Sequence, residues 1–152
     1  MKTAGAVKTA LLDLNILTAL LWPTHEHHDL AHRWFAARGN ASWATCSLTQ
    51  LGFVRIVANP AFSPDALSPG EALALLAENL THAGHDYWTD SLQVTAAVKP
   101  MESRLQGYRQ LTDAYLLALA SRHKGVLATF DRGLRTLAGD ALGACVEVVP
   151  TR

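Results

Sequence analysis

The feature that most constrains the fold is the alternation of short apolar runs with longer stretches of helical periodicity. Residues 7–14 (VKTALLDL), 41–46 (ASWATC) and 126–130 (VLATF) are short apolar runs of the kind that form buried strands. Residues 24–38 and 47–57 carry apolar side chains at helical spacing. Strands that alternate with helices indicate an α/β fold, in which a parallel or mostly parallel central sheet has helices on both faces.

The remaining segments continue this alternation. Ser68, Pro69 and Glu71 predict a helix start, because they supply a capping serine, a proline in the first turn and a capping-box glutamate. Gly39 and Gly125 are expected to end the helices before them. The other expected elements are a helix beginning near residue 16, helices over 69–82, 92–99, 113–123 and 131–138, strands over 85–89 and 146–149, and a polar connection over 101–110.

Length and composition limit the class of protein. A chain of 152 residues with 49% hydrophobic and 17% charged residues is expected to form one domain over residues 1–152. The 13 Lys and Arg residues balance the 13 Asp and Glu residues, so any contact with nucleic acid has to be local or shared with a partner. Cys46 and Cys145 form no CxxC pair, which suits a reducing cytosol and argues against a zinc knuckle.

The N-terminal region could pass for a signal peptide, because Lys2 and Lys8 precede an apolar run. Asp13 and Asn15 interrupt that run, and no small-residue cleavage site stands out after it. No stretch reaches the ~18 uninterrupted apolar residues that a membrane span requires. We therefore expect a cytoplasmic protein with no membrane segment.

Three aspartates occupy positions where a sheet of this kind binds its ligands. Asp13 follows the first expected strand, Asp131 follows the strand over 126–130, and Asp113 comes directly after the expected helix cap Thr112. Ligands of such sheets bind beyond the carboxyl ends of the strands, so the three side chains are expected to meet there. Carboxylates packed together are costly unless protons or a cation compensate them, and Mg²⁺ or Mn²⁺ bound through oxygen is the usual solution.

A purely structural interpretation of each aspartate competes with a metal site. Asp113 would stabilise a helix dipole, and Asp131 would cap the short helix after it. Asp13 has no obvious capping task at the end of an apolar strand. Taken together, the three positions favour a metal site.

The sequence resembles a known family through four segments in this order: LLDLNIL, SLTQLGFVRI, LTDAYLLALA and LATFDRGL. These segments resemble the PIN-domain ribonucleases, and among them the VapC toxins of toxin–antitoxin pairs, over nearly the whole chain. The resemblance implies a single PIN-like domain in which Asp13, Asp113 and Asp131 hold Mg²⁺ or Mn²⁺. It also implies that the metal activates a water for attack on an RNA phosphodiester, with Asn15 and Thr129 supporting the aspartates.

One position departs from the family pattern. Many members carry a glutamate early in the second main helix, where this chain has Gln50. Gln50 can support the site through its carbonyl oxygen but adds no negative charge, so we expect weaker metal binding. A structural reading is also available, because Ser47 and Gln50 have the spacing of a capping box.

The same resemblance implies partners for the chain. These are an RNA substrate, a VapB-type antitoxin whose C-terminal tail covers the acidic cleft, and a second copy in a homodimer. Basic side chains near the cleft would position the RNA backbone, and the sequence does not rank the candidates. The candidates are Arg55, Arg104, Arg109, Arg122, Lys124 and Arg132.

Three other interpretations remain open. His28 and His32 lie one helical turn apart, close to His25 and His27, and such a pair can bind zinc, although a solvated helix face is the better interpretation. A different Mg²⁺-dependent phosphoesterase is disfavoured by the absence of GxxxxGK[ST] and GxGxxG motifs. A PIN-like binding module that has lost catalysis is the alternative outside the enzymes.

Overall fold

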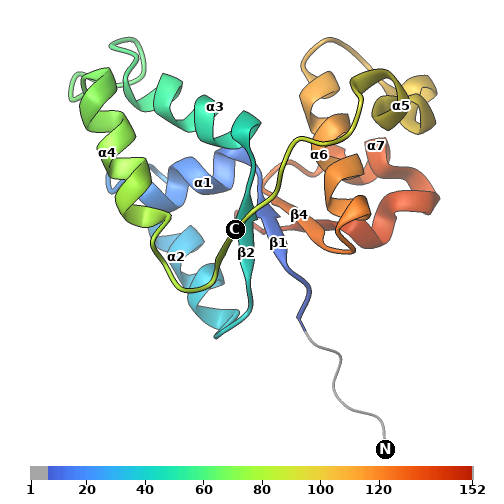
Figure 1. Ribbon diagram of the computed structural model, residues 1–152, viewed down its shortest axis with the longest axis horizontal. Coiled ribbons are helices and arrows are strands. Elements are labelled where there is room, and N and C mark those ends of the chain that lie inside the picture. Colours follow the sequence, from blue (N-terminus) through green and yellow to red (C-terminus); the bar gives the residue numbers. More distant parts are fainter. Residues whose placement is uncertain (1–6, 152) are drawn as a thin grey trace, which may run out of the picture.

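A five-stranded parallel sheet forms the centre of the computed structural model, which describes residues 7–151 (Figure 1). The strand order is β3-β2-β1-β4-β5, and every neighbouring pair is parallel. The expected α/β fold with a mostly parallel sheet is thus confirmed, and all of the described pairs are parallel. The strands are β1 (Ala10–Leu12), β2 (Trp43–Thr45), β3 (His85–Tyr87), β4 (Val126–Thr129) and β5 (Val146–Val148).

Helices cover both faces of this sheet, as expected. In Figure 1, α1 to α4 lie on one side of the strands and α5 to α7 on the other. Two short 3-10 helices, η1 (Lys99–Arg104) and η2 (Gly143–Cys145), connect elements of the second group. The α-helices are α1 (Leu14–Leu21), α2 (His28–Ala37), α3 (Ser47–Val57), α4 (Pro69–Asn79), α5 (Val94–Val98), α6 (Gln110–Arg122) and α7 (Gly133–Leu142).

The alternation of side chains along β1 divides the core in two. Ala10 and Leu12 point into the cluster under α1 to α4, and Leu11 points into the cluster under α6 and α7. All three side chains are fully buried. A strand buried on both faces has to be apolar throughout, which is why this segment reads as a continuous apolar run.

Local capping signals predicted some helix boundaries correctly. Ser68 Oγ accepts a hydrogen bond from Glu71 N at 3.1 Å, and Glu71 Oε1 accepts one from Ser68 N at 2.8 Å. This reciprocal capping box starts α4 at Pro69, as expected. Gly39 has a φ of +63° directly after the C-cap of α2, the left-handed conformation that glycine adopts most readily.

Other boundaries differ from the expectation. The capping box expected from Ser47 and Gln50 forms one residue earlier, between Cys46 and Thr49, because β2 runs directly into α3. The expected polar connection over 101–110 contains most of η1. The next helix, α6, begins at Gln110, so Thr112 lies inside the first turn and is not its cap.

Gly125 is required for a different reason from the one expected. The left-handed residue after α6 is Lys124, with a φ of 56°. A Cβ atom on Gly125 would lie 2.5 Å from the carbonyl oxygen of Thr9. Glycine is needed here because the chain entering β4 passes directly against the chain entering β1.

The helices give no sign of a membrane segment. None of those in residues 7–151 combines the length and the apolar character needed to cross a bilayer. Lys2, one of the two lysines that precede the apolar run resembling a signal peptide, lies outside the described residues.

Candidate active site

A cleft of about 950 Å³ opens beyond the carboxyl ends of β1 and β4. The strand order places these two strands side by side at the centre, and the helices that follow them cover opposite faces of the sheet. Such a switch point leaves a crevice, and ligands of α/β sheets bind there. The residues that line the cleft are Asp13, Leu14, Asn15, Thr18, His25, Ile56, Asn59, Ala61, Phe62, Arg109, Asp113 and Asp131.

The structure therefore brings the three predicted aspartates into one cleft. Asp13 directly follows β1, Asp131 lies two residues after β4, and Asp113 lies in the first turn of α6. Asn15, predicted as a supporting residue, lines the same cleft. Parallel pairing of β1 with β4 explains how residues far apart in sequence meet at this edge.

Asp13 is the most buried of the three carboxylates, with 6% of its surface exposed. Its Oδ1 atom accepts a hydrogen bond from Leu14 N at 2.8 Å, so Asp13 caps α1. The expectation that Asp13 has no capping task was wrong, because α1 begins at the next residue without an intervening loop. Burial raises the pKa of the Asp13 carboxyl, against the hydrogen bonds from Thr129 and Leu14 that lower it.

Thr129 ties both strand ends together through its hydroxyl. The Thr129 hydroxyl donates to Asp13 Oδ2 at 2.7 Å. The same oxygen accepts from Asp131 N at 3.0 Å and from Asn15 Nδ2 at 3.4 Å. Asn15 Oδ1 in turn accepts from Phe130 N at 3.3 Å. Thr129 and Asn15 therefore hold the carboxylate of Asp13 in one orientation relative to the chain that carries Asp131.

Asp113 lies in α6 and lines the same cleft as Asp13 and Asp131. Its pKa is raised from 3.8 to about 7, first by burial and then by the negative charges of Asp13 and Asp131. Asp131 Oδ1 also accepts from the backbone N of Gly133, the first residue of α7, at 2.8 Å, but the N-cap residue of that helix is Arg132 and not Asp131 as expected. The carboxylates thus repel one another across the cleft.

No basic side chain compensates this repulsion by direct contact. Within residues 7–151, no Lys, Arg or His nitrogen lies within 4.0 Å of a carboxylate oxygen of the three aspartates. In the same range, no three His, Cys, Asp or Glu side chains are arranged to hold a metal ion between them. The site is a set of neighbouring carboxylate oxygens around a cleft, without a basic side chain in direct contact.

Gln50 has a different position from the other predicted site residues. It does not line the cleft, and its Nε2 atom donates to Thr45 Oγ1 at 2.9 Å. Thr45 ends β2, the strand beside β1, and its hydroxyl also contacts His85 Nε2 at 2.7 Å. Gln50 is therefore one strand away from Asp13, in a polar chain at the same edge of the sheet.

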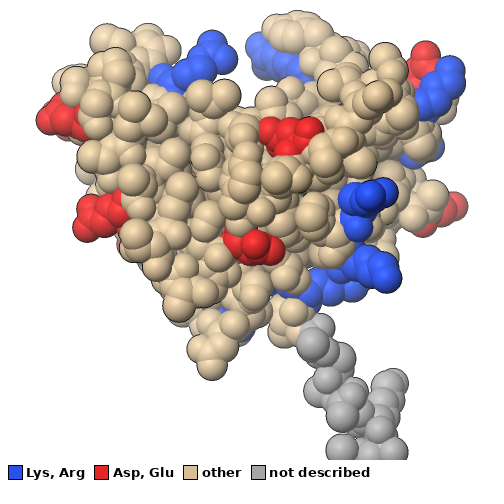
Figure 2. All heavy atoms as spheres, in the orientation of Figure 1, with Lys and Arg blue, Asp and Glu red and all other residues tan. Residues whose placement is uncertain are grey.

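The structure separates the basic residues that the sequence left unranked. Arg109 lines the cleft, and Arg55 lines an adjoining hollow of about 360 Å³ that shares Leu14, Ile56 and Asn59 with it. Figure 2 shows basic side chains on both sides of a notch at the top of the molecule. Arg104 instead donates to the carbonyl oxygens of α7, at 2.8 and 3.2 Å.

The histidines join two helices. His28 Nδ1 lies 2.8 Å from the Ala19 carbonyl oxygen, and His32 Nε2 lies 2.8 Å from the Leu20 carbonyl oxygen. Each ring thus contacts the last turns of α1 from α2. The contacts give His28 and His32 a packing role that the helical spacing alone did not indicate.

Seven cleft residues were not among those predicted from the sequence, namely Leu14, Thr18, His25, Ile56, Asn59, Ala61 and Phe62. Thr18 lies on the α1 face that begins with Leu14, so helical spacing from Asp13 onward was a usable signal. Asn59 and Phe62 come from the loop after α3, which has no such periodicity.

Comparisons with known proteins point to one family. Residues 10–140 match the family model of the PIN domain. Ribonuclease VapC39 from Mycobacterium tuberculosis is 40% identical over 141 residues, covering 93% of this chain and 99% of that protein. Ribonuclease VapC38 from the same organism is 43% identical over 140 residues, covering 92% of this chain and 97% of that protein.

A solved structure shows the same fold. The crystal structure of FitAcB from Neisseria gonorrhoeae superimposes with a TM-score of 0.55 at 20% sequence identity, covering 86% of this chain and 93% of that chain. At this identity the likeness concerns the fold alone. From the match to the family model and the identity to its relatives, the chain belongs to the PIN-domain family and, within it, to the VapC ribonucleases.

Proposed function

We propose that this chain is a Mg²⁺-dependent endoribonuclease, the toxin of a toxin–antitoxin pair, whose metal ligands are drawn from Asp13, Asp113 and Asp131. Relatives named as ribonucleases, which match over nearly their full length, support the activity. We also propose that the chain forms one domain over residues 1–152 and that the protein is cytoplasmic.

The observation that carries the proposal is the uncompensated repulsion in the cleft. Burial raises the pKa of Asp13, and burial together with two neighbouring carboxylates raises the pKa of Asp113 to about 7. A hard divalent cation removes this cost, and oxygen atoms of Asp, Asn and Thr are the donors it prefers. Mg²⁺ commonly keeps several waters and is held by one or two carboxylates, so it does not require three converged acidic side chains.

The surrounding residues have definable tasks in such a reaction. A bound Mg²⁺ supplies an activated water and shields the charge that grows on the phosphate. Thr129 and Asn15 keep the Asp13 carboxylate oriented through their hydrogen bonds. Arg109 lines the cleft, and in this proposal it would hold an RNA phosphate near the carboxylates.

The test is RNA cleavage with and without Mg²⁺, using Asp13→Asn, Asp113→Asn and the control Asp140→Asn. Asp140 is exposed on α7 and does not line the cleft. We expect the first two variants to lose activity by about a hundredfold or more, because several kcal/mol of charge stabilisation depend on the bound ion. Asp13→Asn also keeps a capping oxygen for α1.

Undiminished cleavage by Asp13→Asn would contradict the proposal. RNA binding without any cleavage would favour the alternative of a PIN-like binding module. Cleavage that does not respond to Mg²⁺ or Mn²⁺ would contradict the metal dependence alone.

The proposed partner is a VapB-type antitoxin whose basic tail occupies the acidic cleft, with a homodimer as the expected assembly. Growth arrest on expression, relieved by the antitoxin and abolished by Asp13→Asn, tests the toxin role. If the native protein cleaves RNA in vitro but its expression leaves growth unaffected, the toxin role is contradicted.

A further inference from the structure

The cleft contains a second region that the carboxylates do not occupy. Beyond Asp13 and Asn15, the lining continues with Thr18 and His25 from α1 and the turn after it. The opposite wall is formed by Ile56 at the end of α3 and by Phe62 in the loop that follows. We call this region, lined by Thr18, His25, Ile56, Asn59, Ala61 and Phe62, the apolar arm of the cleft.

Thr18 lines this arm and carries a buried hydroxyl that is unpaired among the described residues. Its surface is only 4% exposed, and its Oγ1 atom has no hydrogen-bond partner among the described residues. A helical threonine commonly bonds the carbonyl four residues before it, and Thr18 does not. A buried hydroxyl without a partner costs free energy, which a ligand that donates or accepts a hydrogen bond would recover.

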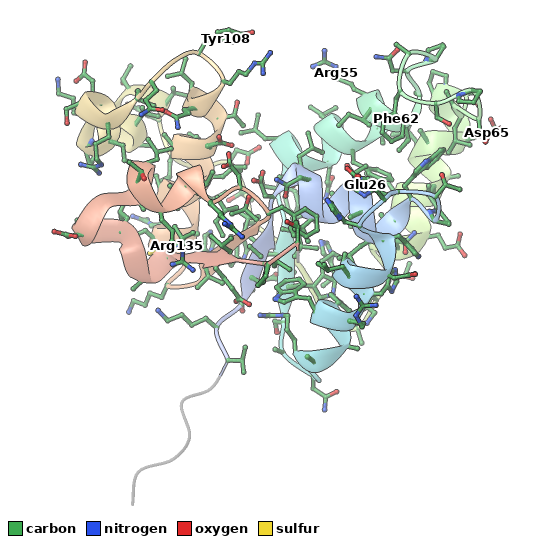
Figure 3. The ribbon with its side chains drawn as sticks, turned by 180° about the vertical axis from the view of Figure 1, so that it is seen from behind. Glu26, Arg55, Phe62, Asp65, Tyr108 and Arg135 are labelled. Carbon is green, nitrogen blue, oxygen red and sulfur yellow. The ribbon has the colours of Figure 1, made fainter. Side chains whose placement is uncertain are left out.

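Phe62 presents an aromatic ring that is held in place. Its ring packs edge-on against Trp22, with centroids 5.6 Å apart and an interplanar angle of 62°. The turn that carries it is fixed by Asn59, whose carbonyl oxygen accepts from Phe62 N and whose Oδ1 accepts from Ala61 N, both at 2.9 Å. With 38% of its surface exposed in the loop after α3 (Figure 3), Phe62 forms a preorganised stacking surface.

His25 adds a polar group without a charge. Its Nδ1 atom accepts a hydrogen bond from His27 N at 3.0 Å, so the neutral ring carries its proton on Nε2. Burial lowers the pKa of His25, which keeps the ring neutral near pH 7. The arm therefore offers hydrogen-bonding groups and an aromatic ring, with no Lys, Arg, Asp or Glu in its lining.

These groups follow one another along α1. Asp13 caps the helix, and Thr18 lies five residues later, about 7–8 Å along the helix axis. Trp22, which supports Phe62, lies one turn beyond Thr18 on the same face. A phosphate held at the carboxylate end would therefore place the adjoining nucleoside in the apolar arm.

We infer that the apolar arm binds one unpaired nucleobase, next to the phosphate that is cleaved, by stacking on Phe62 and hydrogen bonding to Thr18. The inference rests on the proposed function for the position of the phosphate. A base inside a duplex cannot reach such a pocket, so the substrate is RNA that is single-stranded at the cleavage site. The arm, and not the carboxylates, then sets the preference for one base.

The test is a titration of metal-free protein with adenosine, guanosine, cytidine and uridine, with ribose as the base-free probe. Uncharged nucleosides avoid repulsion between phosphate and the carboxylates. Binding is followed by NMR at the Thr18 methyl group and the Phe62 ring. We expect at least one nucleoside to shift both signals and ribose to shift neither.

Four variants make the test specific. Phe62→Ala should weaken nucleoside binding by about tenfold, since one stacking contact is lost, while Phe62→Tyr should retain it. Thr18→Val keeps the shape and removes the hydroxyl, and should weaken binding by about fivefold. Leu73→Ala, which removes an exposed apolar side chain of α4 outside the cleft, should change nothing.

Absence of a signal shift with all four nucleosides, or binding that Phe62→Ala leaves unchanged, would overturn the inference. This outcome is separable from failure of the proposed function, because the titration requires neither metal nor cleavage. A protein that binds nucleosides through Phe62 but never cleaves RNA would keep the base site and contradict the nuclease. A protein that cleaves RNA but binds no nucleoside would keep the nuclease and contradict the base site.

Discussion

Asp13 shows how one side chain serves both the fold and the site. One carboxylate oxygen caps α1, and the other accepts the hydrogen bond from Thr129. The residue is buried at the point where β1 passes directly into α1, so its charge is held where water cannot fully solvate it. The cost of this placement appears as a raised pKa, and the proposed cation would remove it.

The pH dependence of stability should report on Asp113. Its pKa is about 7 in the folded protein and 3.8 ordinarily, so between these values the unfolded chain has released a proton that the folded protein still binds. Stability therefore falls as the pH rises from 3.8 to about 7, and the full penalty is present above that. In EDTA at pH 8, Asp113→Asn should have a higher thermal midpoint than the native protein.

This gain should shrink toward about pH 3, where the carboxyl is largely protonated in both states. Thermal unfolding followed by circular dichroism at the two pH values measures it, with Asp140→Asn as the surface control. A gain of equal size at both pH values would show that Asp113 is not the group responsible.

Gln50 gives a second prediction at the residue scale. It lies one strand away from Asp13, where many family members have a glutamate, and its amide bonds Thr45. Gln50→Glu adds a negative charge at this edge of the sheet, and the Thr45 hydroxyl can donate to the new carboxylate. We expect tighter Mg²⁺ binding by the variant, measured by calorimetric titration; equal affinities would refute the idea that Gln50 weakens the site.

At the scale of elements, α2 is attached to α1 by its histidines. His28 and His32 contact the carbonyl oxygens of Ala19 and Leu20, and Ala31 between them is fully buried. Since α1 carries Asp13, Asn15 and Thr18, this attachment supports the floor of the cleft.

Replacing either histidine should therefore destabilise the protein. His28→Ala and His32→Ala should each lower the free energy of unfolding by about 1 kcal/mol, as expected for the loss of one hydrogen bond. Urea unfolding measures this, with the exposed Arg33→Ala as the control on the same helix. A rise in the thermal midpoint of native protein on addition of Zn²⁺, absent in both variants, would support the zinc interpretation instead.

At the scale of the whole molecule, charge is balanced overall and distributed locally. The net formal charge is zero, yet Arg109 lines the cleft and Arg55 lines the hollow beside it. In Figure 3, Arg55 on α3 and Tyr108 before α6 stand on opposite sides of the top of the molecule. We therefore expect bound RNA to contact few Lys or Arg side chains, all of them near the cleft.

The salt dependence of RNA binding should accordingly be shallow. Each phosphate contact contributes a slope of about −0.7 in a plot of log affinity against log salt for a single strand. Arg109→Gln should reduce the magnitude of the slope by about 0.7, and Arg135→Gln on α7, away from the cleft, should leave it unchanged. Filter binding of a single-stranded RNA oligomer in EDTA measures both; equal slopes for native protein and Arg109→Gln would exclude a phosphate contact.

The sequence by itself determined the secondary-structure elements and the residues whose side chains can act chemically. Apolar runs and local caps predicted the strands and the start of α4, because such signals act within a few residues. The positions of Asp13 and Asp131 after strands predicted a shared edge, because parallel strands end together. The PIN-domain resemblance predicted the same family that the comparisons show.

Only the tertiary structure decided how these residues meet. The bridge through Thr129 and the position of Gln50 one strand away from Asp13 depend on contacts between β1, β2 and β4. The apolar arm depends on a loop after α3 that packs against the end of α1. Such contacts between elements leave no local pattern in the sequence. The three aspartates were therefore predictable, because each follows a strand or lies in the first turn of a helix, whereas the residues that surround them in the cleft were not.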